Sequence, residues 1–316
     1  MLPHMASDPA VADETAIAVT TGLTSLARRL TPLAWAFVVL AALDLAQRLL
    51  WSFPVPDLTW GLTWVARAVT HGLLVALPAA VLAADPDGWR TRRLVLVGAL
   101  TIAGAELVSL AVAVYRATIL SPDAPATERL AGEALGDLLR FVLVLASVVG
   151  PALLGAGLAR RYRGRVGGPS WRPAPVTLAI LLVGATTTAL QILQVLGESG
   201  PVHRLEVVTG AMAAFHALAW AYVAAVTLPD SGIIGAERRP RMALAAGALS
   251  TVAAGLVSTL LIAMLDRAVE VPAAALTLPP LLSALGVILL ICGLATSAPD
   301  PRARPTAGRA ATPSRA

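Results

Sequence analysis

Ionisable and amide side chains interrupt otherwise apolar stretches of this 316-residue chain. Asp44 and Arg48 are four residues apart, as are Arg67 and His71, so each pair would share one face of a helix. Glu106 stands alone in a long apolar segment. The full set is Asp44, Arg48, Arg67, His71, Glu106, Arg140, Gln191 and His216. Side chains of these types could bind an ion, carry a proton or hold a metal.

Structural roles compete with these chemical ones. Asp44 and Arg48 fit an ion pair, Arg67 and Arg140 could extend to a membrane surface, and Gln191 could join two helices by hydrogen bonds. For each of these residues taken singly, the structural interpretation is favoured.

The two histidines and Glu106 differ in this respect. For His71 and His216, a neutral ring hydrogen-bonded across helices is favoured over metal ligation. Glu106 is predicted to lie near mid-membrane, where a carboxylate persists because it is paired or because its ionisation is used. A coupling role is therefore as well supported as a structural pairing with Arg67 or His71.

The elements that position these groups follow from composition. The chain is 57% hydrophobic and only 14% charged, which is too apolar for a water-soluble domain. An apolar stretch of about 20 residues can cross a bilayer as a helix. The sequence predicts eight such spans, an all-α integral membrane fold: Leu30–Trp51, Gly61–Ala83, Leu94–Tyr115, Leu138–Ala159, Val176–Leu196, Val207–Leu228, Met242–Leu265 and Ala273–Ala295. Prolines at positions 78, 151, 279 and 280 are expected to kink their helices.

Arginine alternates between the segments that connect these spans. It precedes the first span and follows every even-numbered one, whereas the other connections are acidic, for example Asp123 and Glu198. Positively charged loops stay in the cytoplasm. The pattern predicts a multi-pass plasma-membrane protein with both termini cytoplasmic.

An internal repeat is also predicted. His71 and His216 are each followed 14 residues later by an aspartate, and the segment beginning Gly98-Ala-Leu matches the one beginning Gly247-Ala-Leu. Two parallel four-helix repeats follow, related by an axis along the membrane normal. The predicted division is a disordered tail at 1–29, a first repeat at 30–159, an Arg-rich linker at 160–175, a second repeat at 176–296 and a disordered tail at 297–316.

Three functions remain open. Transport of a small molecule or ion is favoured by the repeat and the intramembrane charges, which would line a cavity open to the outer side. A non-catalytic membrane subunit or assembly factor is the first alternative, with the Arg-rich loops contacting a membrane or cytoplasmic protein partner or anionic lipid. A haem-binding redox protein using His71 and His216 is the second. No motif identifies a catalytic residue, a metal cluster or a cofactor, and membrane orientation explains the arginines without a nucleic-acid partner.

The haem alternative rests on an architectural resemblance. The predicted layout resembles that of haem A synthases, which have eight spans in two four-helix halves with histidines in corresponding spans. This sequence departs from that pattern. Its fourth and eighth spans have no histidine, no glutamate shortly precedes His71, and the outer loops lack a cysteine pair. The chain also contains no lysine, which excludes a P-loop.

Overall fold

A computed structural model describes residues 31–51, 58–84, 93–118, 126–163, 175–197, 204–228 and 238–297. The predicted N-terminal tail, nearly all of the predicted C-terminal tail and most of the predicted linker lie outside these ranges. The described residues are almost entirely helical and include no strand; the longest non-helical stretch among them is 266–272.

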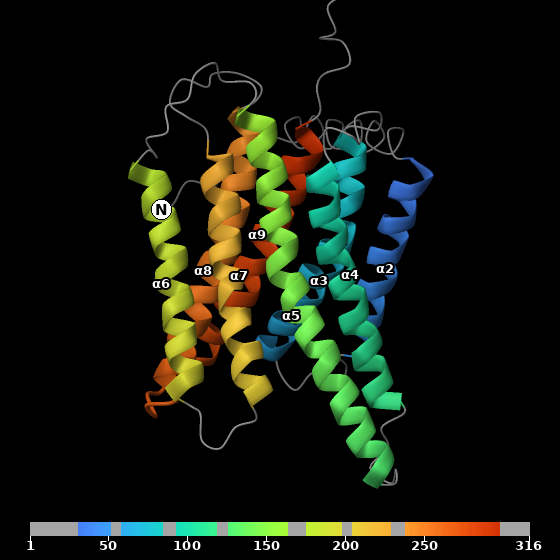
Figure 1. The fold of residues 1–316 in the computed structure, drawn as a ribbon, viewed down its shortest axis with the longest axis vertical. Helices are drawn as coiled ribbons and strands as arrows, with labels where there is room; N and C mark the ends of the chain where they lie inside the picture. The colour runs from blue at the N-terminus through green and yellow to red at the C-terminus, as the bar shows by residue number, and fades with distance from the viewer. Residues whose placement is uncertain are drawn as a thin grey trace, which may run out of the picture.

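Eight helices in this part of the chain are long and apolar enough to cross a membrane, which confirms the predicted all-α membrane fold (Figure 1). Their bounds are α2 Pro32–Trp51, α3 Leu58–Ala84, α4 Arg93–Thr118, α5 Ala126–Arg163, α6 Pro175–Gly197, α7 Arg204–Thr227, α8 Arg238–Leu265 and α9 Leu278–Thr296. Each predicted span lies within or almost within one of them, except the last, whose first five residues form a 3₁₀ helix before α9.

Helix α5 is longer than predicted. It has 38 residues and begins at Ala126, whereas the apolar part that could span a membrane is Leu138–Tyr162. The preceding segment is polar but rich in Ala, Leu and Glu, which are strong helix formers. The helix therefore continues past the apolar part, and its lower end projects beyond the other helices in Figure 1.

The expected kink at Pro279 and Pro280 is wrong. A short 3₁₀ helix, Ala273–Thr277, precedes α9, and the two prolines occupy the first turn of α9. Proline is well tolerated there because the first amide groups of a helix have no intrahelical partner. Pro78 and Pro151 do lie inside their helices, in α3 and α5.

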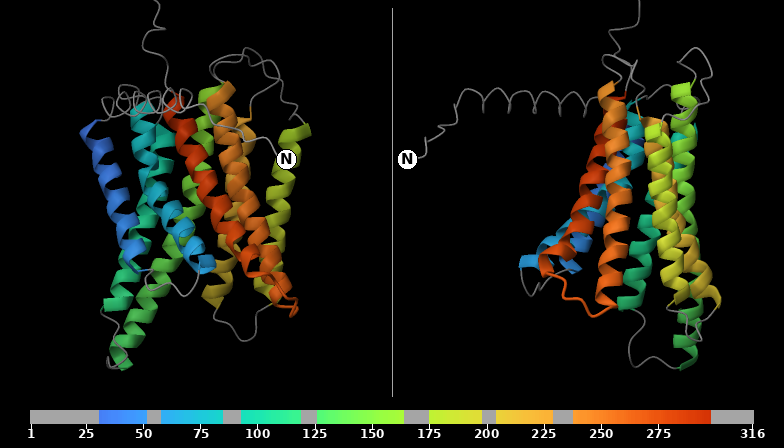
Figure 2. Two further views of the ribbon diagram at one scale, coloured as in Figure 1. Left: turned by 180° about the vertical axis from the view of Figure 1, so that it is seen from behind. Right: turned by 90° about the vertical axis from the view of Figure 1, so that its left-hand side faces the viewer.

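The same order of helix contacts is found in both halves of the bundle, α2–α5 and α6–α9. In the first half α2 packs on α3, α3 on α4 and α4 on α5; in the second half α6 packs on α7, α7 on α8 and α8 on α9. The halves join through two further contacts, α5 with α7 and α9 with α3. Helices α3 and α7 are the most buried spans, at 56% and 44%, whereas α2 and α6 are only 17% and 22% buried. Accordingly, α2 and α6 stand at opposite edges of the bundle (Figures 1 and 2).

Glycines set the closest helix approaches at matching places. A Cβ on Gly98 of α4 would lie 2.7 Å from the carbonyl oxygen of Gly150 in α5. A Cβ on Gly247 of α8 would lie 2.6 Å from the carbonyl oxygen of Gly286 in α9. Each pair lets two helix backbones touch, which larger side chains would prevent.

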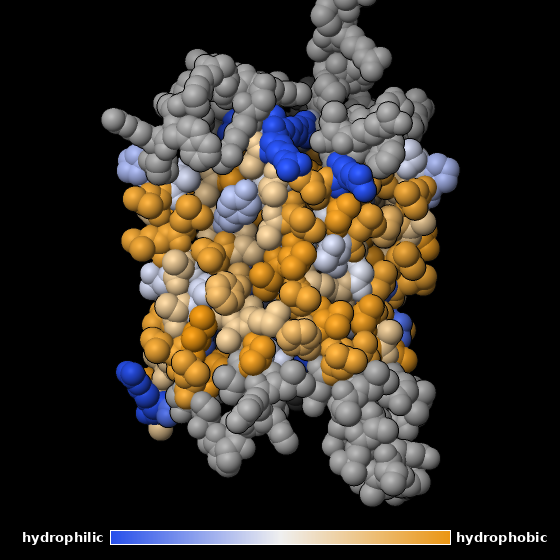
Figure 3. Space-filling model, viewed as in Figure 1, coloured by the Kyte–Doolittle hydropathy of each residue, from blue (hydrophilic) through white to orange (hydrophobic). Residues whose placement is uncertain are grey.

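The surface has the polarity expected of a membrane-embedded bundle. A broad hydrophobic belt separates hydrophilic groups near the two ends (Figure 3). Many large apolar side chains on the belt are exposed, such as Leu182 at 65% and Leu43 at 61%. One end, where the even-numbered helices begin, is called the arginine-rich end. Its described arginines are Arg93, Arg160, Arg161, Arg163, Arg238, Arg239 and Arg241.

At the arginine-rich end, Arg241 links the two halves. The residue is 5% exposed, and its guanidinium donates to the carbonyl oxygens of Thr227 and Leu228 at the end of α7. It also lies 4.4 Å from the ring centroid of Tyr162 in α5. A second link is made where Arg161 of α5 donates to the carbonyl oxygen of Ser297, just after α9.

Candidate functional site

Four ionisable side chains from three helices meet in the first half of the bundle, and we call them the polar cluster: Asp44, Arg48, His71 and Glu106. Nδ1 of His71 lies 2.6 Å from Oε2 of Glu106. Nη2 of Arg48 lies 3.6 Å from the same oxygen. The pairing of Glu106 with His71 that the sequence suggested is therefore present, and Arg48 replaces Arg67 as the cation beside it.

Arg48 bridges α2 to α4 in two ways. Its Nε donates to Oδ2 of Asp44 at 2.9 Å, one turn earlier in α2, and its Nη2 donates to the backbone oxygen of Glu106 at 3.2 Å. The Asp44 side chain is fully buried at 0% exposure. Burial without a cation would be costly for such a carboxylate. The i to i+4 spacing thus positions Arg48 both to neutralise Asp44 and to reach the neighbouring helix.

The polar cluster lies deep in the bundle. Glu106 is 13 residues from the start of α4, and His71 is 13 residues from the end of α3. At a rise of about 1.5 Å per residue, both lie roughly 20 Å from the arginine-rich end, near the middle of a 30 Å hydrocarbon layer that begins there. At this depth, charged groups need partners or water.

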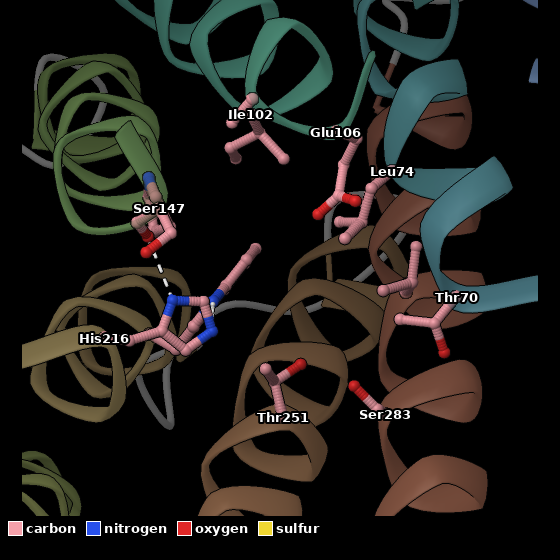
Figure 4. Close-up of a pocket in the computed structure, with 12 residues that line it drawn as sticks. Thr70, Leu74, Ile102, Glu106, Ser147, His216, Thr251 and Ser283 are labelled. Atoms are coloured by element: carbon pink, nitrogen blue, oxygen red, sulfur yellow. Dashed lines mark hydrogen bonds between the residues drawn. The ribbon is translucent and has the colours of Figure 1, made fainter. Parts of the chain in front are cut away.

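A cavity of about 60 Å³ lies next to the polar cluster, between the two halves. This is space for a few water molecules. The lining comes from α3, α4, α5, α7, α8 and α9, and its polar members are Thr70, Glu106, Ser147, His216, Thr251 and Ser283. Figure 4 shows the Glu106 carboxylate on one side of the cavity and the His216 ring on another.

His216 is held on both ring nitrogens. Nδ1 lies 2.9 Å from the backbone oxygen of Ser147 in α5 (Figure 4). Nε2 lies 3.0 Å from the indole nitrogen of Trp220. A carbonyl only accepts and an indole N–H only donates, so the ring is neutral with its proton on Nδ1. His216 therefore joins α7 to α5. In this arrangement neither nitrogen is free to ligate a haem or another metal.

Three of the predicted site residues lie away from the cavity. The Arg67 guanidinium lies 5.7 Å from the ring centroid of Trp64, and Arg140 is exposed on α5. Gln191 of α6 donates to the hydroxyl of Thr259 in α8 at 3.1 Å. Of the eight predicted site residues, Glu106 and His216 line the cavity, with the rest of the polar cluster behind Glu106.

Four hydroxyl residues of the lining were not predicted from the sequence: Thr70, Ser147, Thr251 and Ser283. A signal for two of them exists. Ser147 and Ser283 begin the same pattern, Ser-x-x-Gly-x-x-Leu-Leu-x-x-Gly-Leu-Ala, in the fourth and eighth spans. In both copies the first glycine, Gly150 or Gly286, makes the close helix contact described above. Threonine and serine elsewhere give no such signal, because their hydroxyls commonly bond to their own helix.

Comparisons with known proteins identify no relative. No family model matches the chain, and neither does any curated protein or solved structure.

Proposed function

We propose that this multi-pass membrane protein is a transporter that carries a small solute or ion through the cavity between its two halves. The observation that carries the proposal is the position of this cavity. It lies deep in the bundle, is lined by helices of both halves, and borders the carboxylate of Glu106. Substrate sites of repeat-built transporters lie in this location, because rocking one half against the other then opens the site to alternate sides.

Two equivalent halves would supply that motion, and several observations support the predicted repeat. The helix contacts of the first half recur in the second. The glycine contact between Gly98 and Gly150 recurs between Gly247 and Gly286. Ser147 and Ser283, at matching places in the shared pattern, both line the cavity.

The equivalence extends to the polar cluster, where the chemistry differs. Gly255 is the counterpart of Glu106 in the matched segments of α4 and α8. The nearest side-chain atom to a Cβ on Gly255 is Nε2 of Gln191 in α6, at 3.8 Å. Gln191 of α6 therefore lies beside Gly255 as Arg48 of α2 lies beside Glu106. The second half carries a neutral version of the site, so the charged chemistry belongs to the first half alone.

We further propose that the arginine-rich end faces the cytoplasm of a cell whose plasma membrane holds the protein. Arginines gather at this end and in the connections next to it in the sequence. The positive-inside rule then orients the bundle.

Thiol labelling tests whether the cavity opens to water. Cys292, the single cysteine, is first replaced by alanine, and Ser283→Cys or Leu285→Cys is added. Both positions are on α9 at nearly the same depth. Ser283 lines the cavity, whereas Leu285 is 50% exposed on the apolar surface of the bundle that faces away from the cavity. In liposomes, Ser283→Cys should react with a membrane-impermeant thiol reagent added on either side, and Leu285→Cys should not. Equal inertness of the two cysteines would overturn the transport proposal and favour a non-transporting subunit.

A further inference from the structure

The polar cluster carries one unbalanced negative charge. Asp44 and Glu106 contribute two carboxylates, and Arg48 contributes one guanidinium. With a neutral His71 the sum is minus one. A net charge at this depth is costly, so one further positive charge would stabilise the cluster.

Acceptor oxygens remain for that charge. Within the described part of the chain, both contacts of the Glu106 carboxylate, from His71 and from Arg48, are made to Oε2. Oε1 is left to the cavity that Glu106 lines. Oδ1 of Asp44, which lies outside the cavity lining, is also buried and has no hydrogen-bond partner among the described residues.

Three of the four hydroxyl groups around the cavity, those of Thr70, Thr251 and Ser147, have already used their hydrogens. Thr70 donates to the backbone oxygen of Ala66 at 2.8 Å, and Thr251 donates to that of Gly247 at 3.1 Å. Ser147 likewise donates to a backbone oxygen of its own helix, at 2.8 Å. A hydroxyl whose single hydrogen is committed offers only lone pairs to a ligand.

The ring nitrogens of the lining are committed in the same way. The N–H of His216 donates to the Ser147 backbone, and the N–H of Trp220 donates to His216. The cavity therefore presents a carboxylate and hydroxyl oxygens, with these donors turned away. Such a lining favours a cation and disfavours an anion or a ligand that only accepts hydrogen bonds.

We infer that the cavity binds one small monovalent cation, in competition with one proton taken up by the His71–Glu106 pair. This inference rests on the proposed transport function and names its ligand. A volume of about 60 Å³ has room for an alkali-metal or ammonium ion. A divalent ion would replace an excess of one negative charge with an excess of one positive charge.

Proton and cation compete because each neutralises the same single charge. The charged groups that face the pair are Asp44 and Arg48 from α2, and neutral His216 faces it across the cavity from α7. On α5 the nearest described ionisable residue is Arg140, which is exposed and about two turns from Ser147. Once the cluster holds a proton, its attraction for the cation is lost. Alternating access would then exchange the cation for a proton.

Thermal unfolding of the purified full-length protein tests the inference. Sodium, potassium and ammonium chloride are titrated separately at pH 8 and at pH 6, with N-methyl-D-glucamine chloride holding the ionic strength constant. At pH 8 at least one small cation should raise the Tm in a saturable way, because it binds only the folded protein. Where the proton competes, each unit of lower pH should weaken the apparent affinity by up to about tenfold. No effect above N-methyl-D-glucamine, or equal affinity at both pH values, would overturn the inference.

Two sets of variants locate the site. Glu106→Gln should weaken the cation effect by about tenfold or more, because it removes a charged partner of the ion. Glu270→Gln makes the same chemical change on an exposed residue and should respond as the parent does. Thr251→Val keeps the side-chain shape, removes one lone-pair donor and should also weaken the effect, which provides a second test if Glu106→Gln fails to fold. If Glu106→Gln binds the cation with the affinity of the parent, the assignment is wrong. If Glu106→Gln does not fold, parental cation affinity in Thr251→Val has the same meaning.

The outcomes separate this inference from the transport proposal. A pH-dependent cation effect with no thiol reactivity at Ser283→Cys would keep the binding site and refute transport. Thiol reactivity from both sides without any cation effect would keep transport and refute the cation site.

Discussion

His71 and Glu106 come from neighbouring helices and approach to 2.6 Å between Nδ1 and Oε2. The contact is short enough that a proton must lie between the two atoms, because two bare acceptors would repel each other. Arg48 lies on the same oxygen from a third helix, so one carboxylate joins α2, α3 and α4.

Replacing Arg48 should strongly destabilise the protein. Arg48→Gln removes the one cation that contacts Asp44 among the described residues, and the Asp44 side chain is 0% exposed. Breaking a buried pair from one side costs about 3–5 kcal/mol, because the remaining charge is stranded. Thermal unfolding should show the loss, and the double variant Asp44→Asn with Arg48→Gln should recover most of it. A double variant no more stable than the single one would show that the ion pair is not the cause.

Replacing His71 should alter the pH dependence of cation binding. His71→Gln can still donate to Glu106, but its amide has no basic nitrogen that could take up a proton. Lower pH protonates the parent cluster and weakens its cation binding, so the parent binds more tightly at pH 8 than at pH 6. In His71→Gln this difference should become smaller, as measured by the cation-dependent Tm shift. A full parental difference would place the competing proton elsewhere.

The glycines at the helix contacts should tolerate no side chain. A Cβ at Gly98 would lie 2.5 Å from the backbone nitrogen of Leu154, so Gly98→Ala must push α4 and α5 apart. Overpacking of this kind costs about 1–3 kcal/mol, and Gly247→Ala should show a similar loss if the halves are equivalent. Gly104→Ala is the control, because its Cβ would meet nothing within 4 Å. Thermal unfolding of the three variants measures the differences, and tolerance of alanine at Gly98 would contradict the packing.

Arg241 should stabilise the arginine-rich end. Arg241→Gln loses the cation at the end of α7 and the contact with the Tyr162 ring, 4.4 Å from the guanidinium. Charged hydrogen bonds to helix-terminal carbonyls and a desolvated cation–π contact predict a loss of about 2–3 kcal/mol. The exposed Arg238 offers a matched control, and Arg238→Gln should change the unfolding temperature little. Equal effects of the two substitutions would refute the role of Arg241.

Topology can be measured with reporter fusions. A fusion after Arg165 should report from the cytoplasm, whereas fusions near Asp123 and Glu198 should report from outside, because arginine-rich connections are retained inside. An external signal after Arg165 would reverse or break the predicted orientation.

The sequence alone determined the membrane fold. Eight apolar stretches separated by charged connections can be read without any tertiary contact, because the bilayer fixes both the length and the polarity of a spanning helix. The sequence also predicted ion pairs whose two partners lie on one helix, such as the i to i+4 pair of Asp44 and Arg48. The ends of the helices were harder to predict. The starts of α5 and α9 depend on the helix preference of the residues there and not on hydrophobicity.

Tertiary structure decided which of the ionisable residues belong together. Arg48 and Arg67 each stand four residues before or after another ionisable residue of their own span. Of the two, the structure brings only Arg48 to Glu106, whereas Arg67 lies against Trp64. The structure also turned His216 into a neutral link between α7 and α5 and assembled the hydroxyl lining from helices far apart in the chain. Contacts between helices depend on their rotation about their own axes. In spans so uniformly apolar, hydrophobicity does not specify that rotation, which is set by the glycine contacts and polar pairs themselves.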